Sequence, residues 1–208
     1  MKGIFEMKPP SIRYEFIWDV DVVLKFLSNL YPNEDIPLDY LTHKLVMLLA
    51  LATKQRAQTL HVISIKDIRI TDNVIVIHIK KLLKHSRQGN LKQSLILKPY
   101  VDPSICVVKT MNEYIKRTED IRGNYNQLFI SFQKPHKPVS RDSISRWIKK
   151  VLLEAGIDTS MFKAHSTRAA SSSAAKRDCV PIEEIMKSAG WSNSNTFHKF
   201  YDKIIITG

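Results

Sequence analysis

Cysteine is scarce in this sequence, and its scarcity excludes two classes of small protein. The 208 residues include two cysteines, Cys106 and Cys179, which lie far apart in the chain. Two isolated cysteines cannot form a disulfide framework or a Cys-x-x-Cys metal site. The seven histidines are scattered and gather with neither cysteines nor carboxylates. We therefore expect no bound metal, and a reducing compartment such as the cytosol or the nucleus.

Long hydrophobic runs are also missing. No apolar run is long enough to span a bilayer, and the N-terminus lacks the apolar core of a secretory signal. No concentrated amphipathic basic helix is present that would bind a membrane surface. We therefore expect a protein that is not secreted and has no membrane partner.

Acidic residues are few compared with basic ones. Asp and Glu number 20 against 32 Lys and Arg, which gives a formal net charge of +12. Such an excess favours a polyanionic partner, most simply a nucleic acid. The alternative is a basic protein whose charge serves only solubility.

Apolar residues recur at helical spacing over much of the chain, and hydrophobic residues make up 44% of it. The spacing predicts helices over residues 14–30, 39–53, 104–117 and 140–154, with Asp39 and Ser140 as N-caps. The second of these segments is apolar nearly all round, which predicts a buried central helix. A further short helix is expected to begin at Pro181.

Runs of β-branched residues interrupt the helical pattern. Residues 65–70 and 74–79 flank a turn signal, and a third run covers residues 93–97. No internal repeat or linker divides the chain. The sequence therefore predicts a single domain that is mainly α with a small antiparallel β-sheet (α+β), preceded by an arm over residues 1–13.

The residues most suggestive of chemistry lie near the C-terminus. His165 and Arg168 are one helical turn apart, so both can address a single anion, and Trp191 and Tyr201 follow. A tyrosine held near such a pair could act as a nucleophile. Taken singly, these residues have structural alternatives: a core histidine, a core aromatic residue and a tyrosine on a helix surface.

Basic residues upstream could complete a phosphate-handling site. Arg56 follows the buried helix, and a basic loop over residues 80–92 joins two predicted strands. The outer face of the helix over residues 140–154 carries Arg141 and Arg146, which suits insertion into a DNA groove. The alternatives are an exposed arginine, a solvated lysine-rich turn and a solvated helix face.

The order of these residues resembles the catalytic domain of tyrosine recombinases, the phage integrase family. Arg56, a lysine in a β-hairpin, His165-Ser-Thr-Arg168, Trp191 and Tyr201 occur in sequence, and the resemblance covers residues 39–201. Residues 163–168 and 196–201 look most like recombinases of eukaryotic mobile elements of the DIRS and Crypton kinds. The resemblance implies a catalytic domain over residues 14–203, in the nucleus for such an element and otherwise in the cytoplasm.

The resemblance implies a role for each residue at the scissile phosphate. Arg56 and Arg168 would clamp its non-bridging oxygens, where negative charge develops in the transition state. His165 would bond the same phosphate or assist proton movement. Trp191 would donate its indole N–H, because it cannot accept a proton. Tyr201 would attack and form a 3′-phosphotyrosyl link.

The leaving 5′ oxygen would receive its proton from a lysine of the basic loop. We assign this role to Lys84, with Lys80 and Lys81 as alternatives. No cofactor is implied, because two arginines take the place of a cation. Further DNA contacts are expected from Lys54, Lys81, His85, Arg87, Arg141, Arg146 and Lys163.

The implied partners are a double-stranded recombination site and further copies of the chain, forming a homo-oligomer, a tetramer, on DNA. The apolar tail over residues 204–208 would dock onto a neighbouring protomer, or alternatively pack on its own domain. Two other functions remain open. One is a domesticated DNA-binding module without catalysis, and the other is a type IB topoisomerase-like enzyme that relaxes DNA.

Two departures from the family pattern stand out. Many relatives have Thr-Gly-x-Arg before the first arginine, and here the sequence is Thr53-Lys54-Gln55-Arg56. The missing glycine leaves the backbone conformation of that turn open. The helical N-terminal domain with which relatives close around DNA is also missing, so we expect a catalytic-domain fragment.

Overall fold

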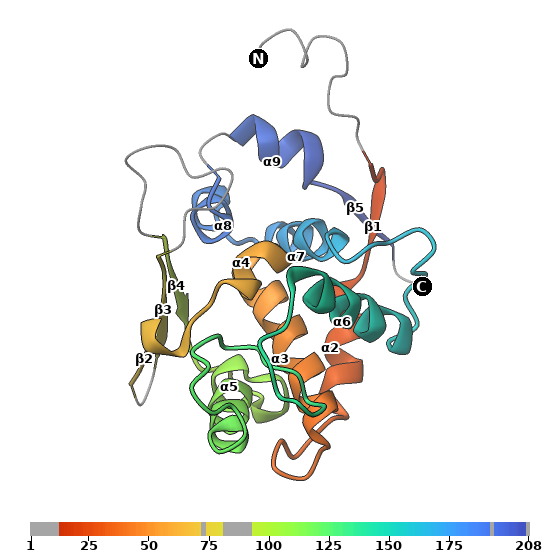
Figure 1. The fold of residues 1–208 in the computed structure, drawn as a ribbon. Helices are drawn as coiled ribbons and strands as arrows, with labels where there is room; N and C mark the ends of the chain where they lie inside the picture. The colour runs from red at the N-terminus through yellow and green to blue at the C-terminus, as the bar shows by residue number, and fades with distance from the viewer. Residues whose placement is uncertain (1–12, 72–73, 81–92, 192–193, 207–208) are drawn as a thin grey trace, which may run out of the picture.

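One central helix organises the core. The computed structural model describes residues 13–71, 74–80, 93–191 and 194–206. Helix α3 (Leu38–Thr53) runs through the middle of the molecule and contacts α4 (Ala57–His61), α5 (Val107–Thr118), α6 (Arg141–Glu154) and α7 (Ser166–Arg177) (Figure 1). Most side chains of α3 are buried on all sides. The prediction of a buried central helix is therefore confirmed.

Three helices begin within two residues of the positions that their capping residues predict. Helix α6 begins after Ser140, whose hydroxyl accepts a hydrogen bond from the Ser143 N–H, as predicted for an N-cap. Helix α3 begins one residue before the predicted N-cap, because Pro37 takes that position and Asp39 lies in the first turn. Pro181 similarly precedes α8 (Ile182–Ala189), and α9 (Ser194–Phe200) follows it.

The helix predicted over residues 14–30 is wrong in its first part. Residues Phe16–Trp18 form strand β1, and helix α2 spans Val20–Ser28. The Asp19 side chain accepts from the Asp21 N–H at 3.1 Å, which caps α2 and separates it from the strand. The apolar residues on both sides of Asp19 face one core, so their spacing alone could not locate this break.

The small antiparallel sheet is confirmed. Strands β2 (Ile68–Ile70), β3 (Ile75–Ile79) and β4 (Gln93–Leu97) lie in that order, with Ile70 opposite Ile75 and Ile77 opposite Leu95. The alternate residues of β3 are buried, as expected for a sheet with one face on the core. Residues Ile65–Asp67, predicted as strand, form a 3₁₀ turn instead, and a second such turn spans Pro103–Ile105.

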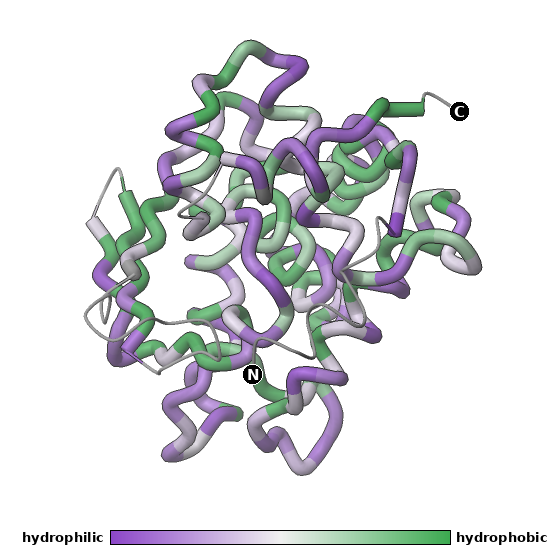
Figure 2. Tube along the Cα trace, turned by 90° about the horizontal axis from the view of Figure 1, so that it is seen from above, coloured by the Kyte–Doolittle hydropathy of each residue, from purple (hydrophilic) through white to green (hydrophobic). Residues whose placement is uncertain are grey.

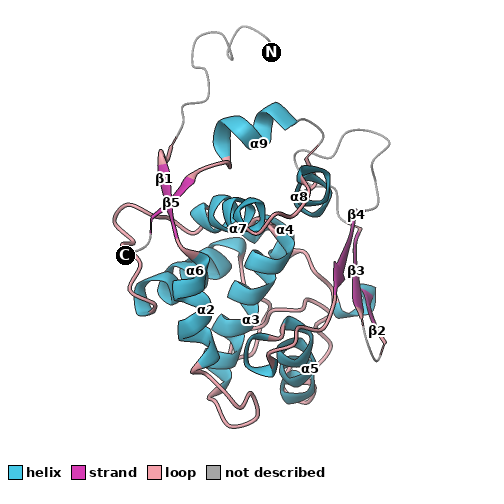
Figure 3. Ribbon diagram, turned by 180° about the vertical axis from the view of Figure 1, so that it is seen from behind, coloured by secondary structure: helices cyan, strands magenta, loops and turns pink. Residues whose placement is uncertain are grey.

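The C-terminal tail pairs with its own chain. Strand β5 (Ile204–Ile206) lies parallel to β1, with Ile17 opposite Ile205, on the side of the molecule away from the antiparallel sheet (Figure 3). Of the two arrangements considered for the tail, the structure has the one in which it packs on its own domain. This pair was not predicted, because three-residue strands far apart in sequence carry no local signal.

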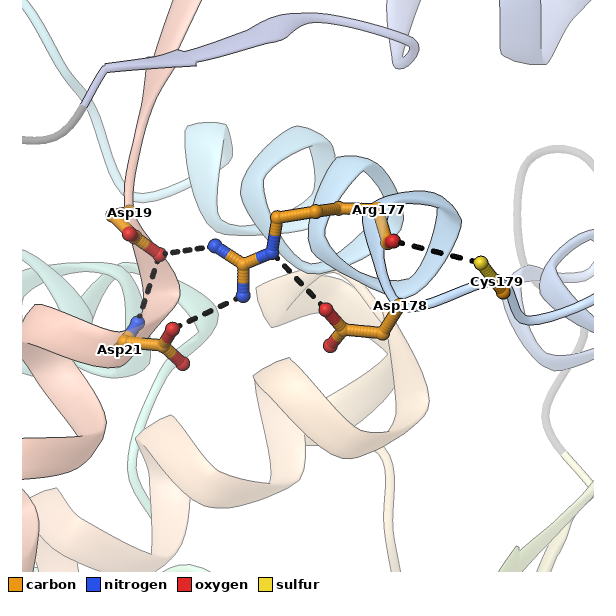
Figure 4. A network of polar contacts seen from close by, with 5 residues as sticks. All are labelled: Asp19, Asp21, Arg177, Asp178 and Cys179. Atoms are coloured by element: carbon orange, nitrogen blue, oxygen red, sulfur yellow. Dashed lines mark hydrogen bonds and ion pairs between the residues drawn. The ribbon is translucent and has the colours of Figure 1, made fainter.

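Charged contacts attach the end of α7 to the start of α2. The Arg177 guanidinium lies 3.0 Å from Asp19, 3.1 Å from Asp21 and 3.1 Å from Asp178 (Figure 4). The Sγ of Cys179 lies 3.9 Å from the Arg177 carbonyl oxygen. The contacts hold β1, α2 and α7 together at one point.

Apolar residues concentrate at the centre of the molecule and hydrophilic stretches at its periphery (Figure 2). Within the described part of the chain, no helix combines the length and the hydropathy that crossing a membrane requires.

Candidate active site

Arg56 enters the site from a tight turn between α3 and α4. Lys54 ends α3 with φ 55°, the left-handed conformation that glycine adopts most easily. The turn therefore keeps the conformation that the missing glycine would favour, at a cost of about 1 kcal/mol for a residue with a Cβ. The buried Gln55 amide donates to the carbonyl oxygens of Thr53 (3.3 Å) and Ser188 (2.9 Å), which fastens the turn to α8.

His165 and Arg168 lie at the start of α7. His165 occupies the N-cap position in a right-handed helical conformation, and the Arg168 N–H donates to its carbonyl oxygen at 3.3 Å. The predicted spacing of one turn is confirmed. The two side chains differ in environment, because His165 is exposed whereas Arg168 is 6% exposed.

The Arg168 guanidinium is fixed by a carbonyl and two aromatic rings. Its Nη2 donates to the Ala189 carbonyl oxygen at 2.7 Å, and its Cζ lies 4.7 Å from the Trp191 ring centre and 5.5 Å from the Tyr201 ring centre. Its Nε is buried and has no hydrogen-bond partner among the described residues. Burial lowers the pKa of Arg168 to about 10, so the group stays charged at neutral pH.

Trp191 and Tyr201 form a stacked pair. Their ring centres are 4.4 Å apart with an interplanar angle of 26°. Trp191 therefore uses its ring face, with Tyr201 against it and Arg168 over it. The sequence had suggested an indole N–H donor to phosphate, and that role stays a prediction.

The Tyr201 hydroxyl faces Arg56. Nη2 of Arg56 donates to the hydroxyl oxygen at 3.4 Å. Ser173 on α7 holds the backbone next to Tyr201. Its Oγ donates to the Tyr201 carbonyl oxygen at 2.7 Å and accepts from the Lys203 N–H at 3.0 Å. Helix α7 thus supplies both Arg168 and the support for the tyrosine.

His165 is surrounded by cationic groups. Nη1 of Arg13 lies 3.2 Å from both ring nitrogens, and the Tyr14 ring centre lies 5.6 Å from the imidazole. Desolvation, with the positive charges of Arg13 and Arg56, lowers the pKa of His165 below its ordinary value. The lowered pKa favours the neutral imidazole.

A cavity of about 260 Å³ opens between α4, α6 and α7. Its walls combine three arginines and a histidine with small polar and apolar residues: Gln55, Arg56, Ala57, Gln58, Arg141, Asp142, Ser145, Ile148, Ala164, His165 and Arg168. Guanidinium groups bind phosphate oxygens through paired N–H donors. The cavity can therefore hold a phosphodiester group, and the Tyr201 hydroxyl is within hydrogen-bonding reach of Arg56 on its wall.

The basic loop cannot be compared with its prediction. Lys81, Lys84, His85 and Arg87 lie outside the described residues, so their predicted roles stay predictions. Lys80, one of the two alternatives to Lys84, forms an ion pair with Asp67 and its side chain is 70% exposed.

The remaining predicted DNA contacts fall into three settings. Arg141 lines the cavity and is paired with Asp142 at 2.9 Å. Arg146 and Lys163 are exposed and bond within their own segments, to Ser143 and to Thr159. Lys54 is partly buried, and this burial lowers the pKa of its ammonium group. The structure thus brings one of these four residues, Arg141, to the cavity.

Sequence reasoning missed two contributors. Gln55 was noticed only as part of a departure from the family pattern, yet its amide fixes the turn that presents Arg56. Arg13 was assigned to the arm over residues 1–13, where no periodicity or motif marks it. Its contact with His165 joins positions 152 residues apart and leaves no local signal.

One comparison with known proteins identifies a family. The model described as "Phage integrase family" matches residues 21–204. None of the curated proteins matches the chain. Solved structures match over nearly all of it, at sequence identities low enough that they show the fold alone.

Three solved structures illustrate the likeness. The XerH site-specific recombinase bound to a palindromic difH substrate is 16% identical with a TM-score of 0.65, over 88% of this chain and 48% of XerH. The XerA recombinase is 17% identical with a TM-score of 0.65, over 95% of this chain and 62% of XerA. A lambda integrase dimer bound to a COC′ core site is 15% identical with a TM-score of 0.59, over 98% of this chain and 52% of the integrase chain. The chain thus spans about half to three fifths of these proteins.

Proposed function

The chain belongs to the phage integrase family, and on that premise we propose that it is a site-specific DNA recombinase that cleaves and rejoins DNA through a 3′-phosphotyrosyl intermediate. One observation carries the proposal. Arg56, His165 and Arg168 line a single cavity, and the Tyr201 hydroxyl is 3.4 Å from Arg56. A nucleophile and a set of phosphate-binding donors are thus assembled from three separate parts of the sequence.

In the proposed reaction the Tyr201 oxygen attacks the scissile phosphorus. The bond from phosphorus to the 5′ oxygen breaks, and the 3′ end of the strand becomes linked to the tyrosine. The Tyr201 proton leaves to a base at the cavity, and the 5′ oxygen takes a proton from Lys84 to become a hydroxyl. Attack by a 5′-hydroxyl of another duplex reverses the step and releases the tyrosine, so the bond energy is conserved.

The arginines stabilise the charge that builds on the phosphate oxygens. Arg168 is suited to this because its guanidinium is already held by Ala189 and the two rings, so little reorganisation is needed. Arg56 is exposed and adds a second donor to the lining of the cavity.

We further propose double-stranded DNA as the partner, with a tetramer of this chain as the assembly in which strands are exchanged. The net charge of +12 favours a polyanion, and one similar solved structure is a lambda integrase tetramer bound to a Holliday junction. A eukaryotic mobile element of the DIRS or Crypton kind is the proposed source of the substrate sites, with the nucleus as location. For any other source the proposed location is the cytoplasm.

The test is capture of the covalent intermediate. The substrate is a pool of nicked duplexes with randomised sequence around the nick, so that no recombination site need be known beforehand. The nick lets the short strand with the 5′-hydroxyl diffuse away after attack, which prevents rejoining. We expect an adduct resistant to denaturation with the wild-type protein and none with Tyr201→Phe.

Two further variants make the test specific. Tyr125→Phe removes a hydroxyl from an exposed loop residue and should form the adduct normally. Arg168→Lys loses the forked donor and should slow adduct formation by about 100-fold or more, the effect of removing a transition-state donor. Binding of the pool without any adduct would favour the DNA-binding module and reject catalysis.

The pairing of β5 with β1 favours a second candidate, a type IB topoisomerase-like enzyme. Docking of the tail onto a neighbouring protomer would argue against an enzyme that works as a monomer, and here the tail pairs within its own chain. Relaxation of a supercoiled plasmid at protein concentrations too low for oligomers would support this candidate. Joining of two separate duplexes through the adduct would support the recombinase.

A further inference from the structure

The segment that precedes α2 lies along the start of α7. The Tyr14 hydroxyl accepts from the Lys163 N–H at 3.3 Å, and its ring centre is 5.6 Å from that of Phe162. Further along, the buried Trp18 indole donates to Ser166 Oγ at 2.9 Å. These contacts on both sides of His165 fix the position from which Arg13 reaches the imidazole.

The same segment is attached to the chain that carries the candidate nucleophile. Strand β1 pairs with β5, which begins at Ile204, three residues after Tyr201. One strand therefore connects the His165 side of the cavity with the Tyr201 side. Arg13 lies three residues before this strand, and both connections fix its position.

The chemistry of the contact restricts what His165 can do. The Nη1 of Arg13 lies at the same distance, 3.2 Å, from both ring nitrogens, so the contact sets a positive charge against the ring. A neutral imidazole has one accepting nitrogen and one N–H. A neighbouring cation lowers the basicity of the accepting nitrogen and leaves the N–H as a donor.

The other groups around the imidazole favour the same form. Arg56 on α4 and Arg141 on α6 share the cavity wall with His165, and so does Arg168 on α7 itself. Asp142 is the one carboxylate on that wall, and its Oδ1 accepts from Arg141. Lys163, two residues before His165, is exposed, and its ammonium group donates to the Thr159 carbonyl oxygen. The surroundings are cationic and disfavour a protonated ring.

We propose that Arg13 is a positioning residue whose charge keeps the His165 ring neutral and weakly basic, so that the ring meets the scissile phosphate as a hydrogen-bond donor. The inference rests on the proposed function, and it decides between the two roles left open for His165. The proton of Tyr201 then passes to a base other than this imidazole, such as a water molecule. The depressed pKa of His165 supports the neutral form.

The direct test follows the ring nitrogens of His165 by nitrogen-15 NMR in the protein without DNA. A His165→Gln variant identifies its signals among those of the seven histidines. In wild type we expect a neutral ring at pH 7.5. In Arg13→Gln we expect a protonated fraction at pH 6 about fivefold higher, the effect of one unit charge about 4 Å away in water.

Two controls separate charge from fold. Arg13→Lys keeps a cation and a donor and should lie close to wild type. Lys116→Gln removes one exposed charge on α5, on the far side of α3 from α7, and should leave the His165 spectrum unchanged (Figure 1). An identical His165 titration in wild type and Arg13→Gln would overturn the inference.

The role of His165 is then tested in the adduct assay. His165→Gln keeps an amide donor but has no basic nitrogen, and it should retain adduct formation within about tenfold of wild type, whereas His165→Leu should lose it. Equal loss in both variants would overturn the assignment as a donor. If wild type forms no adduct, the proposed function fails, and the ring-nitrogen spectrum alone still decides whether Arg13 keeps the imidazole neutral.

Discussion

At the scale of single residues, the site depends on how Arg168 is held. Its guanidinium donates to the Ala189 carbonyl oxygen, and the Trp191 and Tyr201 rings lie against it. A buried cation without such partners would be costly. The aromatic pair thus helps to place a cation next to the cavity, and it also orients the Tyr201 ring.

Substitutions of Trp191 separate its ring from its N–H group. Trp191→Ala removes the stack and the cation–π contact, which together contribute about 2 kcal/mol, and adduct formation should slow about thirtyfold. Trp191→Phe keeps a ring and should slow it only about threefold. Rates of adduct formation on the nicked duplexes measure both. A Phe variant as slow as the Ala variant would show that the indole N–H matters more than the stack.

At the scale of elements, the β1–β5 pair closes the domain on itself. It joins the residues before α2 to the residues after α9. Two residues of β1, Ile17 and Trp18, are buried. Loss of β5 would leave β1 without its partner strand. Its removal should therefore weaken the domain even without DNA.

Truncation after Lys203 tests this element. We expect the free energy of unfolding to fall by about 1–3 kcal/mol, measured by urea denaturation of the DNA-free protein. Ile204→Thr alters a residue that is 75% exposed in the same strand and should change it by about 0.5 kcal/mol or less. An unchanged midpoint after truncation would contradict pairing of the tail within its own chain.

At the scale of the whole molecule, the excess of positive charge governs binding. With 32 basic and 20 acidic residues, the chain is suited to displacing counterions from DNA. This contribution depends on phosphates rather than on base sequence. Affinity for a duplex of arbitrary sequence should therefore depend steeply on salt.

Fluorescence anisotropy with a labelled duplex measures this dependence. If about six phosphates are contacted, affinity should fall about 1,000-fold between 50 and 200 mM salt. Arg141→Gln should lower the slope of log K against log salt by about one, because Arg141 lines the candidate phosphate cavity. Lys116→Gln, with the same change in charge, should leave the slope as it is. A slope near zero for wild type would exclude DNA binding through backbone phosphates.

The fold class and the family follow from local features of the chain. Helical spacing located α3 and α6, β-branched runs located β3 and β4, and the order of Arg56, His165, Arg168, Trp191 and Tyr201 indicated the family before any geometry. These features are local or depend on order along the chain. Periodicity and capping residues carry them directly, so they can be read without the fold.

The assembly of the site depends instead on contacts between residues far apart in the chain. The left-handed turn at Lys54, the Gln55 bond to α8, the Arg13 contact with His165 and the β1–β5 pair all join residues or conformations that no local pattern marks. Each depends on a partner tens of residues away or on a backbone conformation that packing imposes. The physical reason is that the energy of such contacts comes from distant groups, while the sequence pattern records the preferences of neighbours.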